Sequence, residues 1–271
     1  MLRSLWTAAS GMKAQQTNVD TIANNLSNIN TTGYKTEKVE FQTLLYQTIQ
    51  GVSYDSEGDI KPIPAQVGLG TKSGAITSQF TQGVLTTSEG AFDFAIEGEG
   101  FFQVQMADGS IGYTRNGALQ MAVDTDGMTL ATAEGYPILD VNGEKITVGN
   151  NYNTSLLEVD PAGNLCYPDE TNNLQPIGIK VGLVQFNNPA GLYKVSGTIF
   201  KETAASGVPR LEETDGDLRP SLIRQGYLEG SNVQAADEMV NLIVAQRAYE
   251  MNSKAITASD EMLQQANNLR K

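Results

Sequence analysis

The sequence predicts an α+β protein, with long N- and C-terminal helices of the coiled-coil type and an antiparallel β-rich domain between them in the chain. Three observations lead to this prediction. Apolar residues recur at intervals of seven near both ends, which is the spacing of a heptad seam. The two terminal stretches contain no proline and share a single glycine. In the middle of the chain, glycine, threonine and asparagine become frequent and the apolar residues alternate, as they do in strands.

The N-terminal helix is predicted from Leu2 to Asn30. Its seam has four large apolar residues seven positions apart: Leu5, Met12, Val19 and Leu26. Three smaller or amide-bearing residues complete a 3-4 spacing with them, and two isoleucines widen the stripe: Ala9, Gln16, Ala23, Ile22 and Ile29. Asn25 and Asn28 belong to an asparagine-rich end followed by Gly33, and such residues favour a helix end. The pattern fits either an amphipathic core helix or a helix that packs mainly on other helices.

The C-terminal helix is predicted from Asn232 to Leu269, with Ser231 or Asn232 as its N-cap. Its repeat is carried by five residues seven positions apart: Ala235, Leu242, Tyr249, Ile256 and Leu263. A helix of roughly 38 residues would span on the order of 55 Å, which is longer than an ordinary domain of this size needs. We therefore expect part of its length to pack against something outside the domain.

The middle of the chain predicts β structure. Alternating apolar residues lead into Asp108-Gly109 and continue beyond it, which predicts a hairpin. Asp126-Gly127 and Asn142-Gly143 predict further turns. The expected division is an N-terminal helix with the start of a connector (1–50), an extended connector (51–90), the β-rich domain (91–205), a return connector (206–230) and the C-terminal helix (231–271).

Composition excludes several classes of function. The chain of 271 residues has 18 basic and 31 acidic side chains and a net charge of −13, which disfavours binding to nucleic acids or anionic membranes. It contains no histidine, so it lacks the commonest general base and metal ligand. Cys166 is the only cysteine, which excludes an internal disulfide. The N-terminus lacks the apolar core of a secretory signal, and no run reaches a membrane-spanning length.

Possible chemical motifs have simpler explanations. Gly98-Glu99-Gly100 is followed by a strand pattern and not by a helix, which disfavours a phosphate site. Asp124 and Asp126 fit a plain turn better than a calcium loop. Asp93, Glu97 and Glu99 alternate with apolar residues and are expected on the solvated face of a strand. We expect no catalytic residue, no cofactor and no metal site.

Both ends resemble the terminal signatures of the bacterial flagellar rod and hook axial proteins. The N-terminal matches run over Ala14–Asp20, Ile22–Asn28 and Thr32–Lys35. The C-terminal matches run over Gln225–Val233, Glu238–Val240, Gln246–Glu250 and Asn252–Ala255. Gly90–Phe102 and Tyr113–Gly117 resemble the shared β domain of the family. The length of the chain and Phe41–Ile49 resemble the distal rod members most closely.

The resemblance implies a structural subunit of the basal-body distal rod, which polymerises into a rigid helical tube, transmits motor torque and encloses the export channel. The implied partners are further copies of the chain, neighbouring rod and hook proteins, and the flagellar type III export apparatus. The implied location is the flagellar basal body, outside the cytoplasmic membrane after export, with no direct membrane insertion. We expect the assembly interface to include twelve residues of the terminal helices: Leu5, Met12, Val19, Ile22, Asn25, Leu26, Asn28, Leu242, Arg247, Tyr249, Ile256 and Leu263.

Three alternatives are compatible with parts of the sequence. A hook or proximal rod protein would belong to the same family. A secreted cell-wall glycan hydrolase would need paired carboxylates beside aromatic sugar platforms, and the acids of this chain are not flanked in that way. A secreted adhesin would explain the β-rich middle but would leave both terminal signatures without a role.

Overall fold

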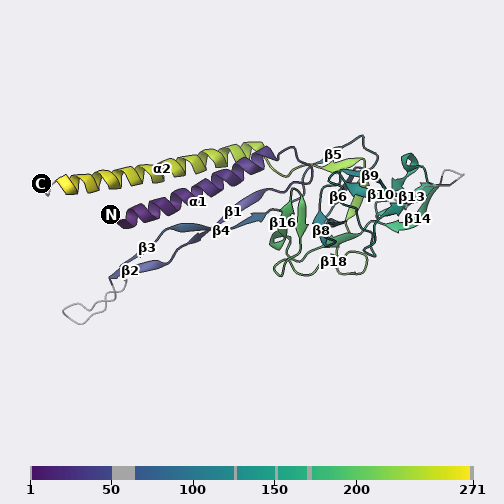
Figure 1. Ribbon diagram of the computed structural model, residues 1–271, viewed down its shortest axis with the longest axis horizontal. Helices are drawn as coiled ribbons and strands as arrows, with labels where there is room; N and C mark the ends of the chain where they lie inside the picture. Colours follow the sequence, from purple (N-terminus) through teal and green to yellow (C-terminus); the bar gives the residue numbers. More distant parts are fainter. Residues whose placement is uncertain (1, 51–64, 125–126, 150–151, 170–172, 269–271) are drawn as a thin grey trace. The chain divides into compact units, whose positions relative to one another are not determined.

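The computed structural model describes residues 2–50, 65–124, 127–149, 152–169 and 173–268. The chain divides into two compact units (Figure 1). The helical unit contains residues 1–26, 37–77 and 234–271, and the β unit contains residues 27–36 and 78–233. The chain therefore crosses from one unit to the other after Leu26, Thr36, Thr77 and Val233. Each unit is built from segments that are far apart in the sequence.

Two antiparallel helices, α1 (Leu2–Ser27) and α2 (Ala235–Asn268), form most of the helical unit (Figure 1). Ser4 Oγ lies 3.3 Å from Ser259 Oγ. One heptad further along α1, a Cβ added to Gly11 would lie 3.0 Å from Asn252 Nδ2, one heptad back along α2. Both predicted helices are confirmed, and a supercoiled geometry of the pair stays a prediction.

The buried positions of α2 follow the seven-residue repeat. Leu242, Ile256 and Leu263 are half-buried, and the small residues Ala245 and Ser259 are fully buried between them. This spacing of three and four residues is what a helix shows when it packs along a second helix.

The expected 3-4 companions on α1 are wrong, because Ala9, Gln16 and Ala23 are exposed. The apolar residues buried on α1 are instead Ala8, Ala14 and Ile22. The reason is a second contact surface: strands of the helical unit also cover α1, and the backbone N–H of Thr71 donates to Ser10 Oγ at 3.3 Å. The buried stripe of α1 is therefore shifted from the one that helix pairing alone would give.

The predicted helix ends need two corrections. α1 ends at Ser27, before the expected Asn30, because Asn28 starts a turn: its backbone carbonyl accepts from Thr31 N at 3.2 Å and its Oδ1 accepts from Thr31 Oγ1 at 3.1 Å. α2 begins at Ala235, so neither Ser231 nor Asn232 is its N-cap. The side chain of Asn232 is engaged in the β unit instead, as described below.

A long two-stranded ribbon completes the helical unit. It pairs β1 (Glu37–Thr43) with β4 (Thr71–Ser78), and β2 (Tyr46–Gln50) with β3 (Ala65–Gly68). Backbone hydrogen bonds join the two pairs, from Leu44 N to Gly70 O at 2.9 Å and from Leu69 N to Leu45 O at 3.1 Å. Part of the stretch expected as a connector (51–90) therefore forms paired strands, and residues 51–64 lie outside the described part of the chain.

The β unit contains several small sheets around one core. A six-stranded sheet has the order β16-β17-β8-β7-β15-β18, two three-stranded sheets have the orders β11-β10-β9 and β12-β13-β14, and two further pairs are β19-β6 and β20-β5. Its elements are β5 (Leu85–Thr87), β6 (Phe94–Glu97), β7 (Phe101–Gln105), β8 (Ile111–Thr114), β9 (Leu119–Asp124), β10 (Gly127–Thr132), β11 (Thr147–Val148), η1 (Thr154–Leu156), β12 (Glu158–Val159), β13 (Asn164–Pro168), β14 (Leu174–Lys180), β15 (Leu183–Gln185), η2 (Pro189–Gly191), β16 (Tyr193–Ser196), β17 (Ile199–Lys201), β18 (Arg210–Leu211), β19 (Leu222–Gln225) and β20 (Tyr227–Glu229).

The predicted hairpin at Asp108-Gly109 is confirmed. β7 and β8 pair antiparallel with Phe102 opposite Thr114, and Gly109 has the positive φ of 78° that favours glycine in such a turn. The turn at Asn142-Gly143 is also confirmed, because Gly143 N donates to Asp140 O at 3.1 Å. Asp126 lies outside the described residues, and Gly127 pairs with Asp124.

The core of the β unit takes its apolar residues from most of these strands. Its largest cluster includes Phe94, Ile96, Phe102, Leu130 and Ile223, all at most 2% exposed. A smaller cluster contains Phe101, Tyr113, Val184 and Phe186, where the rings of Tyr113 and Phe186 meet edge to face at 4.8 Å. Burial raises the pKa of the Tyr113 phenol to about 12.

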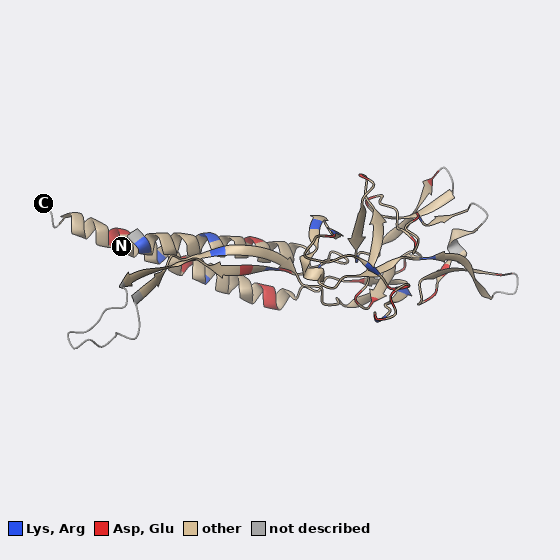
Figure 2. Ribbon diagram, turned by 90° about the horizontal axis from the view of Figure 1, so that it is seen from below, with Lys and Arg blue, Asp and Glu red and all other residues tan. Residues whose placement is uncertain are grey.

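Charged residues are dispersed over the described surface of both units, with acids in many separate strands and loops of the β unit (Figure 2). Over the part of the chain that the structure describes, neither α1 nor α2 has the length and apolar content that a bilayer span requires. The same residues contain no group of three or more acidic or cysteine side chains arranged to hold a metal ion.

Candidate functional site

Three charged side chains meet in the interior of the β unit: Lys35, Arg115 and Glu229. The side chains of Lys35 and Glu229 are fully buried, and that of Arg115 is 1% exposed. A single carboxylate oxygen, Glu229 Oε1, accepts from Lys35 Nζ at 2.7 Å, from Gly83 N at 2.9 Å and from Arg115 Nη1 at 3.4 Å. Lys35 and Glu229 are 194 positions apart, so this cluster joins the beginning and the end of the chain.

Gly98 and Gly100 form the backbone cradle around the Arg115 guanidinium. Arg115 Nε donates to Gly100 O at 3.0 Å, and Nη2 donates to Gly98 O. Gly98 has a φ of +140°, and a Cβ there would lie 2.5 Å from Ser221 Oγ, so a side chain is disfavoured on both grounds. The glycines that the sequence places on either side of Glu99 therefore hold an arginine of the same chain.

The balance of charge in this cluster depends on Glu229. Burial lowers the pKa of the Lys35 ammonium, the Glu229 carboxylate opposes that shift, and the Arg115 charge adds to it. Burial also lowers the pKa of Arg115, with Glu229, Glu99 and Glu212 acting in the opposite direction. Two buried cations thus share one buried carboxylate, and removing that carboxylate would leave both cations without their closest counter-charge.

Asn232 makes a second set of links in the same unit. Its Oδ1 accepts from the backbone N and from Oγ1 of Thr36, both at 2.7 Å. Its Nδ2 donates to Gln79 O and to Thr81 Oγ1, both at 2.8 Å, and to Thr81 O at 3.2 Å. One amide side chain therefore connects three segments that lie next to the points where the chain crosses between units.

Asn25 makes a comparable link inside the helical unit. Its Nδ2 donates to Glu37 O at 2.8 Å, and its Oδ1 accepts from Glu37 N at 2.9 Å. The side chain is 1% exposed and mimics one rung of a strand pair, so it fixes the start of β1 against the end of α1. Asn25 was expected at the assembly interface, and its amide is used within the chain.

The twelve predicted interface residues differ in how accessible they are. Ile22 and Asn25 are buried within the helical unit. Eight residues are half-buried: Leu5, Met12, Val19, Leu26, Asn28, Leu242, Ile256 and Leu263. Of these, Asn28 belongs to the β unit. Arg247 and Tyr249 are exposed. The seam of each helix is thus largely covered by its own chain.

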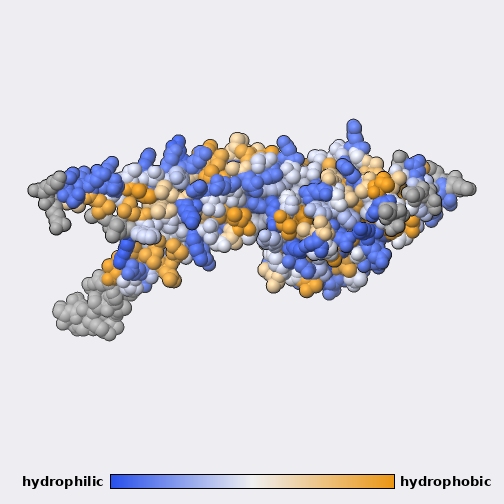
Figure 3. Space-filling model, in the orientation of Figure 1, coloured by the Kyte–Doolittle hydropathy of each residue, from blue (hydrophilic) through white to orange (hydrophobic). Residues whose placement is uncertain are grey.

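Other apolar side chains of the helical unit are exposed (Figure 3). Val240, Ile243 and Val244 are each at least 57% exposed on α2, and Trp6 of α1 is 75% exposed. Further exposed apolar residues lie on α2 and on the ribbon: Met239, Met251, Met262, Phe41, Leu45, Tyr46, Ile49, Val67, Leu69 and Ile76. We call the α2 members Met239, Val240, Ile243, Val244 and Met251 the outer α2 face. Monomeric proteins rarely expose so many large apolar side chains on one unit.

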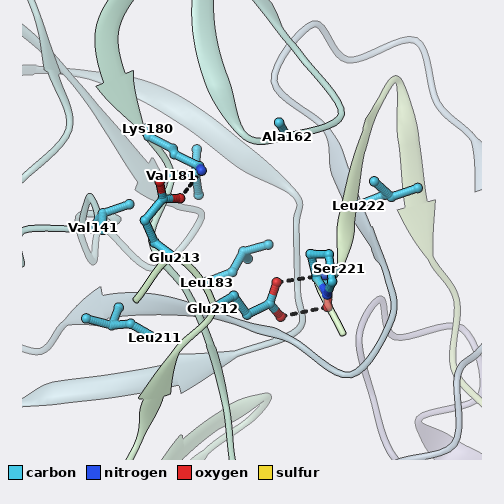
Figure 4. Close-up of a pocket in the computed structure, with 11 residues that line it drawn as sticks. Val141, Ala162, Lys180, Val181, Leu183, Leu211, Glu212, Glu213, Ser221 and Leu222 are labelled. Carbon is cyan, nitrogen blue, oxygen red and sulfur yellow. Dashed lines mark hydrogen bonds and ion pairs between the residues drawn. The ribbon is translucent and has the colours of Figure 1, made fainter. Parts of the chain in front are cut away.

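The β unit contains a cavity of about 230 Å³ beside β14, β15 and β19 (Figure 4). Its polar groups bind one another: Glu212 Oε1 accepts from Ser221 Oγ and Oε2 accepts from Ser221 N, both at 2.7 Å, and Lys180 pairs with Glu213. A second cavity, of about 400 Å³, lies between α1 and α2 and is lined by Gln16, Val19, Gln246, Tyr249 and Glu250.

The sequence assigned no role to Lys35, Arg115 and Glu229 and proposed Asn232 only as a helix N-cap, although all four lie in the motifs that carry the family resemblance. The available signal was the placement of a single charge within each short motif, beside glycine or aromatic residues: Tyr34-Lys35, Arg115-Asn116-Gly117 and Glu229-Gly230. A lone charge in a sequence is normally read as solvent-exposed, because burial of charges is rare. Only the fold shows that these three meet.

Three family models match the chain. The flagella basal body rod protein model matches residues 5–35, the flagellar hook protein FlgE/F/G D1 domain model matches residues 95–167, and the flagellar basal body rod FlgEFG protein C-terminal model matches residues 224–269. The first and third cover the segments with Lys35, Glu229 and Asn232, and the second covers Arg115. The charged cluster thus joins all three matched regions.

Full-length relatives agree with these matches. The chain is 44% identical over 273 residues to the flagellar basal-body rod protein FlgG of Borreliella burgdorferi, with 100% of both chains covered. It is 39% identical over 271 residues to the protein of the same name from Buchnera aphidicola, with 99% of this chain and 100% of the relative covered. With identity of this level along its whole length, the chain belongs to the family of flagellar basal-body rod proteins.

Proposed function

We propose that the chain is a structural subunit of the distal rod in the basal body of the bacterial flagellum, and that its copies polymerise into a rigid helical tube. In this proposal the tube transmits motor torque and encloses the export channel, and the subunit performs no catalysis. The observation that carries the proposal is the exposed apolar surface of the helical unit. Such a surface fits a subunit whose neighbours cover it.

The outer α2 face is the part of this surface that we assign to contacts between copies. Val240, Ile243 and Val244 are 60%, 57% and 62% exposed, and they lie on a helix whose other face is packed against α1. A patch on one subunit that fits a different patch on the next gives a head-to-tail contact, and such contacts build open helical filaments when the rotation does not close.

The twelve predicted interface residues have two roles in this proposal. Those covered by their own chain, such as Ile22 and Asn25, hold α1, α2 and β1 together and so shape the surface that neighbours meet. Those that retain exposure, including Arg247 and Tyr249, contact neighbouring subunits directly. We extend the direct contacts to the outer α2 face and to the exposed apolar residues of the ribbon, which wedge between subunits and keep the rod straight.

The partners in this proposal are further copies of the chain, the adjoining rod and hook proteins, and the flagellar type III export apparatus. Export by that apparatus would place the subunit outside the cytoplasmic membrane. The low ratio of basic to acidic side chains, 18 to 31, supports an assembly partner that is a protein and not a nucleic acid.

A charge on the outer α2 face tests the proposal. Ile243→Asp should leave the subunit folded, because the side chain is 57% exposed in the free chain. It should abolish rod assembly, because the carboxylate would be buried without a partner between copies. The variant is expressed in a strain whose own gene for this subunit has been deleted. The measurements are the number of rods in basal bodies isolated from that strain and the swimming of its cells.

Asn241→Asp is the matched control, because it adds the same charge at an exposed position two residues away on the same helix. The control strain should form rods and swim. Normal rods in the Ile243→Asp strain would contradict the assignment of this face to subunit contacts.

A further inference from the structure

We propose that Asn232 and the buried Glu229 cluster form a stiff joint in the β unit, and that this joint limits the bending of the assembled rod. The joint consists of seven residues, all of them in the β unit: Lys35, Thr36, Gln79, Thr81, Arg115, Glu229 and Asn232. The inference rests on the proposed function, since it concerns the mechanics of the rod. It assigns Glu229 and Asn232 as positioning residues and not as contacts between subunits.

The path of the chain limits how the two units are connected. Covalent connections between the two units exist only after Leu26, Thr36, Thr77 and Val233. A torque that passes from one unit to the other along the backbone must pass through these four crossings. Four separate chain segments would twist and stretch independently of one another, because each residue has two soft backbone dihedral angles.

The joint ties three of the crossings together. Asn232 stands one residue before the last crossing, and its amide binds Thr36, which stands immediately before the second. The same amide binds Gln79 O and Thr81, just after the third crossing, and Gln79 N donates to Thr36 O at 2.8 Å. These segments therefore cannot move apart without breaking several hydrogen bonds at once.

The buried charged cluster supports these hydrogen bonds. The backbone carbonyl of Glu229 accepts from Gly33 N at 2.8 Å, and its carboxylate binds Lys35, two residues further on. Lys35 Nζ also donates to Thr81 O at 2.8 Å. Any displacement of the Lys35 segment from the Glu229 segment would leave charges buried and unpaired, which is strongly unfavourable. This network therefore favours one arrangement of the three segments over all neighbouring ones.

Close backbone packing removes the remaining freedom. A Cβ on Gly33, which has a φ of +68°, would lie 2.6 Å from Asn116 N, and a Cβ on Gly83 would overlap Gly230 O. Gly230 N in turn donates to Val84 O at 2.8 Å. The segments next to the crossings thus touch through backbone atoms, which have no rotamers with which to adapt.

The test replaces Asn232 in the full chain. Asn232→Ala removes the hydrogen bonds that the Asn232 side chain makes with Thr36, Gln79 and Thr81. It leaves the buried charged cluster and the apolar core in place. Asn188→Ala is the matched control, because Asn188 is an asparagine of the same unit whose side chain donates to Ala205 O at 3.1 Å in an exposed loop. Each variant is expressed in a strain that lacks its own copy of the gene, and both the purified subunits and the isolated rods are examined.

We expect the Asn232→Ala subunit to keep the circular dichroism of the parent and to enter rods. Amide hydrogen exchange at 33–37 and 79–82 should become about tenfold faster in the subunit, as expected when local hydrogen bonds are lost. Rods of this variant should show a persistence length at least about twofold shorter in electron micrographs, because stiffness depends on how firmly the crossings are held. The Asn188→Ala rods should bend like the parent rods.

Rods of Asn232→Ala that are as straight as parent rods would overturn the proposal, and so would a folded variant that fails to enter rods, since the role would then lie in assembly. If Asn232→Ala does not fold, Asn232→Asp replaces it, because it keeps the acceptor to Thr36 and loses only the donors to Gln79 and Thr81. Unchanged stiffness of Asn232→Asp rods would likewise overturn the joint. A failure of the parent chain itself to restore rods would instead contradict the proposed function.

Discussion

Glu229 is the residue on which the interior of the β unit depends most. It is fully buried, and one of its carboxylate oxygens accepts from two cationic side chains and one backbone N–H. Its other oxygen, Oε2, is buried without a hydrogen-bond partner in the described part of the chain. A buried ion pair adds little net stability compared with apolar residues, but loss of one partner is costly. The cluster therefore specifies an arrangement more than it adds stability.

Replacing this carboxylate should be strongly destabilising. Glu229→Gln leaves Lys35 and Arg115 buried without their counter-charge, and we expect the free energy of unfolding of the β unit to fall by about 3–5 kcal/mol. Denaturant unfolding followed by circular dichroism measures this change. Glu213→Gln is the control, because it removes the carboxylate of an exposed ion pair with Lys180, and such pairs contribute about 0–1 kcal/mol. Equal effects of the two substitutions would contradict the role of the buried cluster.

Tyr113 should make the β unit sensitive to alkaline pH. Its pKa is about 12 in the folded chain, against 10.0 for a tyrosine in water, because burial disfavours the phenolate. Between these two values the unfolded chain loses a proton that the folded chain keeps, so the free energy of unfolding should fall as the pH rises, by about 1.4 kcal/mol per pH unit.

The measurement is the free energy of unfolding from about pH 9 to about pH 12 for the parent and for Tyr113→Phe, which cannot ionise. The difference between the two curves should grow above pH 10.0 and level off near pH 12. Parallel curves would show that the Tyr113 phenol does not resist ionisation in the folded chain. All groups other than the Tyr113 phenol are the same in both proteins, so their contributions cancel in the comparison.

At the scale of elements, the ribbon depends on its close approach to α1. Gly70 lies where β3 is followed by β4, has a φ of +116°, and a Cβ there would overlap Ser10 Oγ. That hydroxyl also accepts from Thr71 N. The ribbon can therefore lie on the helix only because this position has no side chain.

Gly70→Ala should loosen the ribbon from α1. The strained φ and the overlap together should cost about 1–3 kcal/mol in the free energy of unfolding of the helical unit. Gly74→Ala, also in the ribbon, is the control, because its φ is not positive and its Cβ would lie 3.4 Å from the nearest atom. Thermal unfolding and proteolysis of the ribbon measure both variants. A Gly74→Ala protein as unstable as Gly70→Ala would contradict this explanation.

The elements differ in how well the sequence predicts them. α1 and α2 carry a seven-residue repeat over many turns, and the two helices together contain one glycine and no proline. Both helices were therefore predicted, with errors at their ends. The β7–β8 hairpin was predicted from alternating apolar residues around Asp108-Gly109. The ribbon was not, because β1 and β4 are exposed on both faces for most of their length and so lack the apolar alternation of a half-buried strand.

For the molecule as a whole, the boundaries of the two units differ from the predicted division into terminal helices, connectors and a β-rich middle. The β unit takes in residues 27–36, which follow α1 directly, and the helical unit takes in residues 37–77 from the predicted connector region. The β unit contains the two buried apolar clusters, whereas the helical unit exposes the apolar side chains of the outer α2 face and the ribbon. That asymmetry is what the Ile243→Asp experiment examines.

The sequence by itself determined the α+β class, both terminal helices, the main hairpin and the family, because these depend on local periodicity and on short motifs. Only the tertiary structure decided which helix faces are covered, how the ribbon lies on α1 and which residues carry the interior charge. Lys35, Arg115 and Glu229 stand far apart in the chain, and each alone resembles a solvated surface charge. Their pairing is a property of the folded β unit, since burial and counter-charge arise only when the three segments meet.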